Sequence, residues 1–423
     1  MRKVNKTPSE DKIIVVGAGI VGVSTAIALQ RMGRKVVLID KTGPAAGASF
    51  GNGGVLASCS VVPVTGPGLL RKAPFMLLNK NQPLFMKWGY LPKLMPWLAR
   101  YLSHANAHDT QRISNALMPI IGDSLNDHLA LAKGTGAEKW IKPCDYLYLY
   151  NNRQAFDADA FGWSLRRSHG FEWDELEGQK FRDYDDGFSD EINFAVRLGQ
   201  HGRITSPGDY VSDLANYFQK KGGELRICEV EAILSEGGAV RAIRAGGEVF
   251  ETDKLVITAG IWSKALTDQL GLSIPMETER GYHMELWEPN VMPRAPVMVA
   301  SGKFVATPMQ GRIRLAGVVE FGGLKKAPSQ APFALLERNV RSAMPNLRWG
   351  ETTRWMGHRP APSDSIPIIG EMENKKGIYL GFGHHHVGLT GGPKTGRLLA
   401  SLVAGLTPNQ NMSAYKPERF AVR

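Results

Sequence analysis

The chain has 423 residues, of which 43% are hydrophobic and 22% are charged. This composition is typical of globular proteins, and the length predicts two domains with separate cores. No run approaches 18 uninterrupted apolar residues, which argues against a membrane-spanning helix. The N-terminal segment MRKVNKTPSEDK has a basic start but lacks the apolar region of a cleavable signal, so a cytoplasmic location is expected.

The cysteines give no metal-binding pattern. Cys59, Cys144 and Cys228 lie far apart in the chain, without CxxC spacing. This argues against structural zinc, an iron-sulfur cluster or c-type haem, and it suits a reducing compartment. No metal site is predicted.

The positive charge is concentrated in one part of the chain. The net charge is +11, and no acidic residue lies between Asp40 and Asp109, where seven Lys and Arg residues lie. Within residues 61–105 these cations alternate with aromatic and aliphatic side chains, and six prolines exclude one long amphipathic helix. Two interpretations stay open: peripheral contact with the inner face of the anionic cytoplasmic membrane, or short helices that pack on the protein body. No recognition motif accompanies the charge, so nucleic acid is not expected as a partner.

The N-terminal segment predicts a βαβ unit. An apolar run at residues 13–16 leads into the glycine-rich turn GAGIVG, a helix closed by Gly33, and a second apolar run that ends at Asp40. This order matches a dinucleotide-binding fingerprint. The free N–H groups at the start of the helix favour phosphate.

Each glycine of the turn has a separate steric role. Gly17 permits the tight turn, Gly19 lets a pyrophosphate approach the backbone, and Gly22 allows the helix to pack closely on the strand. Asp40 is positioned to accept hydrogen bonds from a ribose 2′-hydroxyl, which argues against NADP. The fingerprint alone leaves FAD and NAD open.

Several further elements follow from the patterns along the chain. Residues 41–58, rich in Gly, Ala and Ser, predict a second phosphate-binding loop, with a flexible surface loop as the alternative. Ser206 and Pro207 predict the start of a helix that ends at Lys220. Other predicted helices span 114–132, 172–180, 331–343 and 393–406, and predicted strands span 146–150, 224–230, 239–244, 248–251, 254–258, 281–287, 296–300, 304–308, 313–319 and 377–381.

The strand at 254–258 runs into Thr258-Ala259-Gly260, where small residues allow a second close approach to a ligand. A Rossmann unit, a helix, a β-meander and a return strand ending in T-A-G form the layout of flavoproteins with two dinucleotide-binding domains. This order favours FAD over NAD. A third glycine-rich loop at 383–392 precedes the last helix, whose N-terminus would stabilise negative charge on a reduced flavin.

On these segments the chain resembles the D-amino acid oxidase superfamily of flavoproteins, and within it the bacterial D-amino acid dehydrogenases. The motifs that carry the resemblance are VVGAGIVGVSTAIAL, ASFGNGGVL, LVITAGIWSKAL, RGYH, RLAGVVEFGG, GHRPAPSDSIPIIG and GHHHVGLTGGPKTGRLLASLV. The resemblance implies an α/β (α+β overall) fold. It comprises a Rossmann-type FAD-binding domain with a parallel sheet and β-meander (11–65, 200–275 and 351–423) and a substrate domain with an antiparallel sheet (66–199 and 276–350).

The resemblance also implies noncovalent FAD and a set of flavin-binding residues. These are Gly17, Gly19, Ile20, Val21 and Gly22 at the pyrophosphate; Asp40, Lys41 and Val230 at the adenosine; Ser49, Asn52, Gly53, Gly54 and Val55 in the second loop; Ala259, Gly260 and Trp262 at the T-A-G turn; and His386, Val387, Gly388, Leu389 and Thr390 at the flavin pyrimidine.

Four residues are candidates for the substrate side of the site. Arg359 falls where the family's glycine and D-amino acid enzymes bind the substrate carboxylate, and a guanidinium can make two parallel bonds to it. The alternative is an Arg paired with Asp364 or Glu320. Tyr282 is predicted to add a hydroxyl to the same carboxylate, with a core aromatic as the alternative, and His384 or His385 is predicted to line the site near the flavin.

The implied reaction is hydride transfer from the α-carbon of a D-amino acid to flavin N5, with electrons passed to a quinone or another carrier. Three alternatives stay open: an oxygen-using amine oxidase of the glycine or sarcosine oxidase type, the flavin subunit of a D-hydroxyproline or opine dehydrogenase complex, and a non-catalytic flavin-binding protein. Neither the amino acid, its enantiomer nor the oligomeric state follows from these residues.

Overall fold

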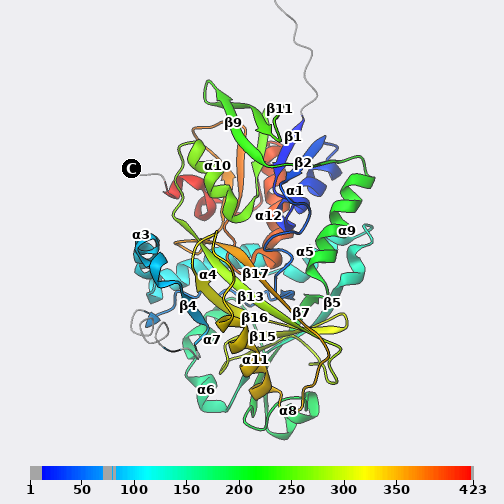
Figure 1. The fold of residues 1–423 in the computed structure, drawn as a ribbon, viewed down its shortest axis with the longest axis vertical. Coiled ribbons are helices and arrows are strands. Elements are labelled where there is room, and N and C mark those ends of the chain that lie inside the picture. Colours follow the sequence, from blue (N-terminus) through cyan, green and yellow to red (C-terminus); the bar gives the residue numbers. More distant parts are fainter. Residues whose placement is uncertain (1–11, 70–78, 80–81, 421–423) are drawn as a thin grey trace, which may run out of the picture.

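The computed structural model describes residues 12–69, 79 and 82–420, and two sheets dominate it (Figure 1). The first sheet has the order β18-β19-β12-β1-β2-β8 and is parallel except for the edge strand β18. Its strands are β1 (Ile13–Val16), β2 (Val36–Asp40), β8 (Glu224–Ile227), β12 (Lys254–Ile257), β18 (Ile368–Glu371) and β19 (Ile378–Phe382). The central strands β1 and β12 are almost entirely apolar and buried, as expected for strands covered on both faces.

Helices α1 (Ile20–Arg31), α9 (Pro207–Lys220) and α12 (Gly388–Val403) pack beside this sheet and share one apolar core with it (Figure 1). The contact between α1 and α12 depends on small residues. A Cβ atom at Gly396 would lie 2.5 Å from Ser24 Cβ and 2.8 Å from the Thr25 nitrogen. Glycine at this position therefore lets the two helix backbones approach each other.

The second sheet lies in the other half of the molecule (Figure 1) and has the order β17-β13-β16-β15-β14-β5-β7-β3. Its strands are β3 (Val55–Leu56), β5 (Ile141–Tyr150), β7 (Phe194–Ile204), β13 (Met276–Trp287), β14 (Val297–Val299), β15 (Phe304–Met309), β16 (Arg312–Phe321) and β17 (Thr352–Pro362), with β4 (Leu84–Met86) beside β16 and β6 (Asp174–Glu177) beside β7. Helix α11 (Ala331–Ala343) packs its apolar face on β13 and β16.

The remaining elements are a small sheet and further helices. A three-stranded antiparallel meander consists of β9 (Val230–Glu236), β10 (Ala239–Ala245) and β11 (Glu248–Glu251). The other helices are α3 (Leu91–Ser103), α4 (Ala107–Ile121), α5 (Ser124–Ala132), α6 (Arg153–Asp157), α7 (Ala160–Ser168), α8 (Gln179–Tyr184), α10 (Ser263–Gln269) and the 3₁₀ turns η1 (Trp88–Tyr90), η2 (Ala137–Trp140), η3 (Gly260–Trp262), η4 (Ser413–Tyr415) and η5 (Pro417–Phe420).

The mixed α/β fold with a parallel and an antiparallel sheet is confirmed, as are the helices at 207–220 and 331–343. The predicted helix at 172–180 is wrong. Residues 174–177 form strand β6, which pairs with the edge of β7, and Gly178 at φ 57 precedes the short helix α8. The predicted strand at 224–230 is two strands, because β8 pairs in the parallel sheet and β9 in the meander.

The last helix begins at Gly388, five residues before the predicted start at Pro393. Proline cannot donate the helical hydrogen bond to the carbonyl of Leu389. That carbonyl instead lies 2.9 Å from Nε2 of His128 on α5, which can donate to it. A side chain from another helix thus satisfies the acceptor that Pro393 leaves free, and the helix continues through the proline.

The segment at 61–105 packs on the protein body through α3. Leu94, Trp97 and Tyr101 are buried, and Trp97 Nε1 donates to the Ala361 carbonyl at 2.9 Å. Trp88, by contrast, is 56% exposed. Residues 70–78 and 80–81 of this segment lie outside the described residues.

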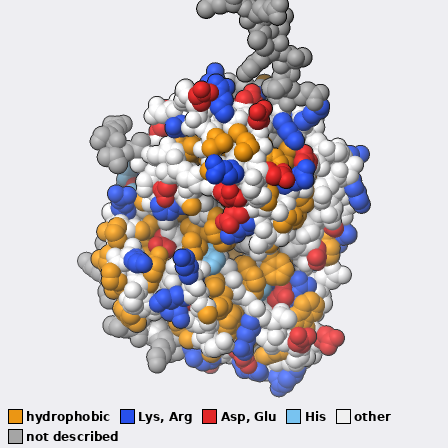
Figure 2. Space-filling view, turned by 45° about the horizontal axis from the view of Figure 1, so that its top comes forward, with side chains coloured by type: hydrophobic (Ala, Val, Ile, Leu, Met, Phe, Trp, Pro, Cys, Tyr) orange, Lys and Arg blue, Asp and Glu red, His pale blue; other side chains and the backbone are white. Residues whose placement is uncertain are grey.

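Charge is distributed rather than gathered on the face drawn in Figure 2, where Lys and Arg side chains are interspersed with Asp and Glu. Over residues 12–69, 79 and 82–420, none of the helices combines the length and the apolar character needed to cross a bilayer.

Replacing Gly396 with alanine is expected to destabilise the protein by about 1–3 kcal/mol, because the new Cβ collides with the α1 backbone and costs more than helix propensity gains. Urea denaturation of the variant measures this loss. The control is Gly89→Ala, an exposed position where a Cβ meets nothing within 4 Å. Equal stability of the two variants would contradict the close contact of α1 and α12.

Candidate active site

A cavity of about 1010 Å³ lies where the two sheets meet. Its wall includes the carboxyl ends of β1, β2 and β12, the first turns of α1 and α12, and residues of β13 and β17. Ligands of open α/β sheets bind at this edge of the strands. The cavity therefore adjoins all three predicted glycine-rich segments.

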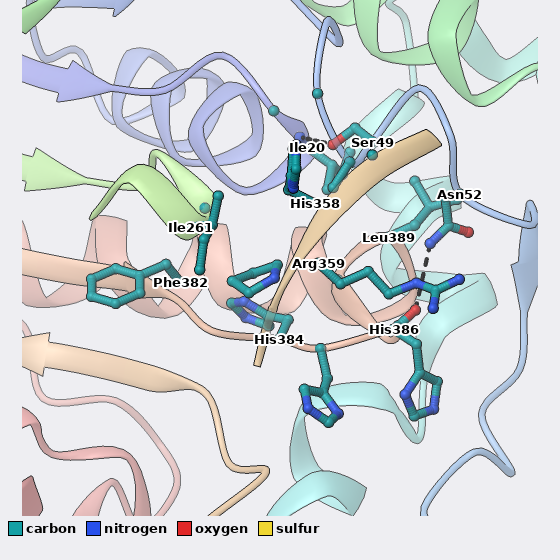
Figure 3. A pocket seen from close by; sticks show the side chains of 18 of the residues that line it. Ile20, Ser49, Asn52, Ile261, His358, Arg359, Phe382, His384, His386 and Leu389 are labelled. Atoms are coloured by element: carbon teal, nitrogen blue, oxygen red, sulfur yellow. Dashed lines mark hydrogen bonds between the residues drawn. The ribbon is translucent and has the colours of Figure 1, made fainter. Parts of the chain in front are cut away.

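The Gly17 turn is shaped for close approach by a ligand and by the helix. Gly17 has φ 105, a conformation that favours glycine, and lines the cavity. A Cβ at Gly22 would lie 1.8 Å from the Gly17 carbonyl oxygen, so Gly22 packs α1 onto the turn without lining the cavity. The Ile20 amide at the start of α1 donates to Ser49 Oγ at 3.0 Å, which brings the second glycine-rich loop to the helix N-terminus (Figure 3).

The residues expected at the adenosine lie together at one part of the cavity wall. Asp40 accepts hydrogen bonds from the amides of Ala18, Thr42 and Gly43, at 2.8, 2.9 and 2.9 Å, so its carboxylate orders the loop after β2. Nζ of Lys41 lies 4.0 Å from the ring centroid of Trp262. Val230 at the start of β9 lines the same cavity.

A buried ion-pair cluster holds the second loop on the antiparallel sheet. Arg314 donates to the carbonyls of Phe50 and Asn52, at 2.9 and 2.6 Å, and also binds Glu285. Burial would raise the pKa of Glu285, but Arg314 and Arg312 outweigh it and lower that pKa to about 2. Glu285 therefore stays ionised and keeps Arg314 in position.

The three consecutive histidines have different surroundings. His384 Nε2 lies 2.9 Å from Thr395 Oγ1, and burial lowers the pKa of His384 to about 4. Burial, together with His385 and Arg359, lowers the pKa of His386 to about 3, and the His386 carbonyl lies 3.5 Å from Asn52 Nδ2 (Figure 3). Both rings are therefore neutral near pH 7. In the described part of the chain, no three His, Cys, Asp or Glu side chains are arranged to hold a metal.

Arg359 extends from β17 into the pocket, toward the side where Asn52, His386 and Leu389 lie (Figure 3). A Cβ at Gly281 on β13 would lie 2.6 Å from its guanidinium carbon, so the guanidinium lies over a residue without a side chain. Burial lowers the pKa of Arg359, and Glu279 opposes that shift. Among the described residues, no hydrogen bond or ion pair within 4 Å occupies the Arg359 guanidinium.

The alternative partners of Arg359 are engaged elsewhere. Asp364 accepts from Arg419 Nε at 2.8 Å, and Glu320 forms an ion pair with Arg280, with Oε2 and Nη1 2.8 Å apart. Neither carboxylate pairs with Arg359, so the structural ion pair considered as the alternative for Arg359 is not formed.

Tyr282 is placed differently from the prediction. Its hydroxyl donates to Glu320 at 2.6 Å and accepts from the Ser329 amide at 3.0 Å, and its ring lies in the core beside Phe333. It does not line the cavity. Successive residues of a strand point to opposite faces, so Gly281 faces the cavity while Tyr282 faces α11. We therefore correct the assignment of Tyr282 to the substrate carboxylate: its structural role is in the core.

The other predicted residues lie together at the cavity, apart from Gly22 and Gly54. Those that line it are Gly17, Gly19, Ile20, Val21, Asp40, Lys41, Ser49, Asn52, Gly53, Val55, Val230, Ala259, Gly260, Trp262, Arg359, His384, His385, His386, Val387, Gly388, Leu389 and Thr390. The prediction missed Glu279, Trp355 and His358, which also line it. Strand alternation could have found Glu279 and Trp355, since each shares a strand face with Gly281 or Arg359.

These features fit FAD. The Gly17 turn and the first turn of α1 line the cavity, the partial positive charge at the start of this helix favours an anion, and the cavity continues from there to the neutral histidines and the N-terminus of α12.

Gly22→Ala is expected to weaken FAD binding about tenfold or more, because its Cβ must displace the Gly17 carbonyl and with it the turn. Titration of apoprotein with FAD, followed by flavin fluorescence, measures the dissociation constant. Gly66→Ala, where a Cβ meets nothing within 4 Å, is the matched control. Unchanged affinity in Gly22→Ala would show that the turn tolerates the shift.

His128 provides a test of pH dependence. Burial lowers its pKa from 6.5 to about 4, so between these values the unfolded chain binds more protons than the folded one. The free energy of unfolding therefore falls as pH drops from 6.5 to 4. His128→Gln should reduce this slope by up to about 1.4 kcal/mol per pH unit relative to wild type, measured by urea denaturation. The exposed His108→Gln is the matched control for the loss of an imidazole.

Comparison with known proteins agrees with this geometry. The family model DAO, described as FAD dependent oxidoreductase, matches residues 12–402. The D-amino-acid oxidase of Bradyrhizobium diazoefficiens is 35% identical over 98% of this chain and 100% of its own length, and the D-amino acid dehydrogenase of Rhizobium rhizogenes is 26% identical over 93% and 96%.

Among solved structures, glycine oxidase from Geobacillus kaustophilus matches with a TM-score of 0.75 at 20% identity, over 97% of this chain and 99% of that one. This likeness shows the fold. Together with the family model and the 35% identity along the full chain, it leads to one conclusion: the protein belongs to the DAO family of FAD-dependent oxidoreductases.

Proposed function

We propose that this protein catalyses the oxidative deamination of D-amino acids. The observation that carries the proposal is Arg359, a cavity-facing guanidinium with no protein hydrogen bond or ion pair among the described residues, beside segments that fit FAD. The names of the Bradyrhizobium and Rhizobium relatives support D-amino acids as the substrate class. When bound in this cavity, FAD would supply the acceptor for a hydride from the substrate α-carbon.

The chain's own residues would orient the substrate. Arg359 can make two parallel charge-assisted bonds to the α-carboxylate, which set both the distance and the orientation of the α-carbon. Gly281 keeps the guanidinium against β13 because it has no side chain. The neutral rings of His384 and His386 and the apolar side chains around them limit water in this part of the cavity. The resulting imino acid would hydrolyse to an oxo acid after release.

For the electron acceptor we propose a membrane quinone or another carrier. The observation in favour is the exposed Trp88 beside α3, on a segment rich in Lys and Arg that suits peripheral attachment. Oxygen is the second candidate, favoured by the name of the Bradyrhizobium relative. A protein that stays in the soluble fraction at low salt and rapidly reduces oxygen would contradict the carrier.

The first experiment is an anaerobic screen of paired D- and L-amino acids against the flavin-loaded protein. Bleaching of the flavin absorbance by D-amino acids is the expected result. Bleaching by L-amino acids alone would contradict the proposed enantiomer, and bleaching by none would contradict the proposed function.

Arg359→Lys is expected to lower kcat/KM for the best substrate by about 100-fold, because a lysine cannot make the two parallel bonds of a guanidinium. Flavin reduction by stopped-flow absorbance gives this value. The matched control is Arg354→Lys on the same strand, where the side chain is exposed and donates to Gln330 at 3.3 Å. A similar loss in both variants would show an effect on β17 rather than on the substrate.

A further inference from the structure

A buried carboxylate lies next to the proposed carboxylate anchor. Glu279 on β13 is the register partner of Arg359 on β17, lines the cavity, and is only 5% exposed. Side chains at directly opposed positions of antiparallel strands share one face, with Cβ atoms about 4.5–5.5 Å apart. An acidic and a basic group are thus presented to the same part of the cavity from adjacent strands.

The side chains of Glu279 and Arg359 form no hydrogen bond or ion pair with each other. The Arg359 guanidinium leans along the strand and lies over Gly281, where a Cβ would be 2.6 Å from its central carbon. His385 also lies next to Glu279, and its Nε2 is 3.6 Å from Glu279 Oε1, beyond hydrogen-bond distance. No hydrogen bond to the Glu279 carboxylate is found among the residues that the structure describes.

His385 is itself incompletely satisfied. It has φ 53, an uncommon conformation for a residue other than glycine, and its amide donates to the Pro360 carbonyl at 3.0 Å. Its Nε2 is buried and has no hydrogen-bond partner in the described structure. A buried carboxylate and a buried imidazole nitrogen, both without a hydrogen bond at these atoms, are costly unless a ligand completes them.

The charges also match the groups of one small molecule. A free α-amino acid carries a carboxylate and an ammonium on the same carbon, and the ammonium offers three donors but no acceptor. When the carboxylate of an amino acid is bound to Arg359, its ammonium group lies close by and needs a negatively charged acceptor that a neighbouring side chain can supply. Glu279 is in register to supply that acceptor, whereas Glu277, two residues earlier on β13, receives the Tyr90 hydroxyl and does not line the cavity.

We propose that Glu279 binds the α-ammonium group of the substrate, so that the cavity selects zwitterions over simple carboxylates. The inference rests on the proposed function, since it takes Arg359 as the carboxylate anchor. Glu279 sets the orientation of the Cα–N bond, and Arg359 sets the position of the carboxylate. Together they define which face of the α-carbon is presented to the cofactor.

The test uses two unreactive probes of nearly equal shape. 2-Methylalanine has no α-hydrogen and cannot be oxidised, and pivalate replaces its ammonium with a methyl group. The dissociation constant of each for the FAD-loaded protein is measured from the change in flavin absorbance and by calorimetry. Wild type should bind 2-methylalanine more tightly than pivalate, because a hydrogen bond to a charged group favours the ammonium.

Glu279→Gln is expected to weaken 2-methylalanine binding by about tenfold or more and to leave pivalate unchanged or tighter. Glu279→Asp, which keeps the charge, should retain the preference for 2-methylalanine. Glu277→Gln is the matched control and should change neither constant. FAD content and the melting temperature of each variant show whether it is folded.

Other outcomes contradict the proposal in distinguishable ways. Equal weakening of both probes in Glu279→Gln would show a structural role for Glu279. If only 2-methylornithine, which carries a second cation, loses affinity, then Glu279 binds a cationic side chain and not the α-ammonium. If the wild-type protein binds pivalate but not 2-methylalanine, the role of Glu279 is contradicted, while Arg359 remains the carboxylate anchor. If it binds neither probe, the proposed function is contradicted.

Discussion

The contact between the Gly17 turn and Thr258 is the constraint on which the cofactor half of the molecule depends. The Thr258 amide and hydroxyl both donate to the Val16 carbonyl at 2.8 Å, and the hydroxyl also lies 3.1 Å from the Gly17 carbonyl. A Cβ at Gly17 would lie 2.6 Å from the Thr258 carbonyl oxygen. The ends of β1 and β12 are thereby joined at one point, and α1 begins beside it, with Ile20 and Val21 of its first turn lining the cavity.

Polar groups join the half with the antiparallel sheet to this point, in addition to the apolar contacts that Ile141, Ile204 and Met276 share with the parallel-sheet core. Arg314 on the antiparallel sheet binds the carbonyls of Phe50 and Asn52, and Asn52 reaches the His386 carbonyl. A buried arginine is stable there because Glu285 is held ionised beside it. The loop at 49–57 is therefore fixed from both sides, which positions the two sheets around one cavity.

Much of this arrangement could be predicted from the chain alone. Glycine-rich turns after apolar strands identify the cofactor segments, since few residues tolerate the backbone of Gly17 or the contact at Gly22. The helix at 172–180 was wrong because pairing with the edge of β7 overrides local propensity. The start of α12 could not be predicted either, because the hydrogen bond that lets it continue through Pro393 comes from His128, 265 residues earlier in the chain.

The error at Tyr282 shows what a motif leaves undetermined. Gly281 and Tyr282 belong to the same short motif, but a strand places them on opposite faces, and only the register of β13 with β17 shows which one faces Arg359. The same register brings Glu279 into the cavity, although no spacing in the sequence connects it to Arg359. The two groups proposed to bind the substrate, Glu279 and Arg359, lie on one face of two paired strands. Their identification therefore depends on knowing which residues are opposed across the sheet, because Glu279 and Arg359 are opposed although they lie 80 positions apart in the chain.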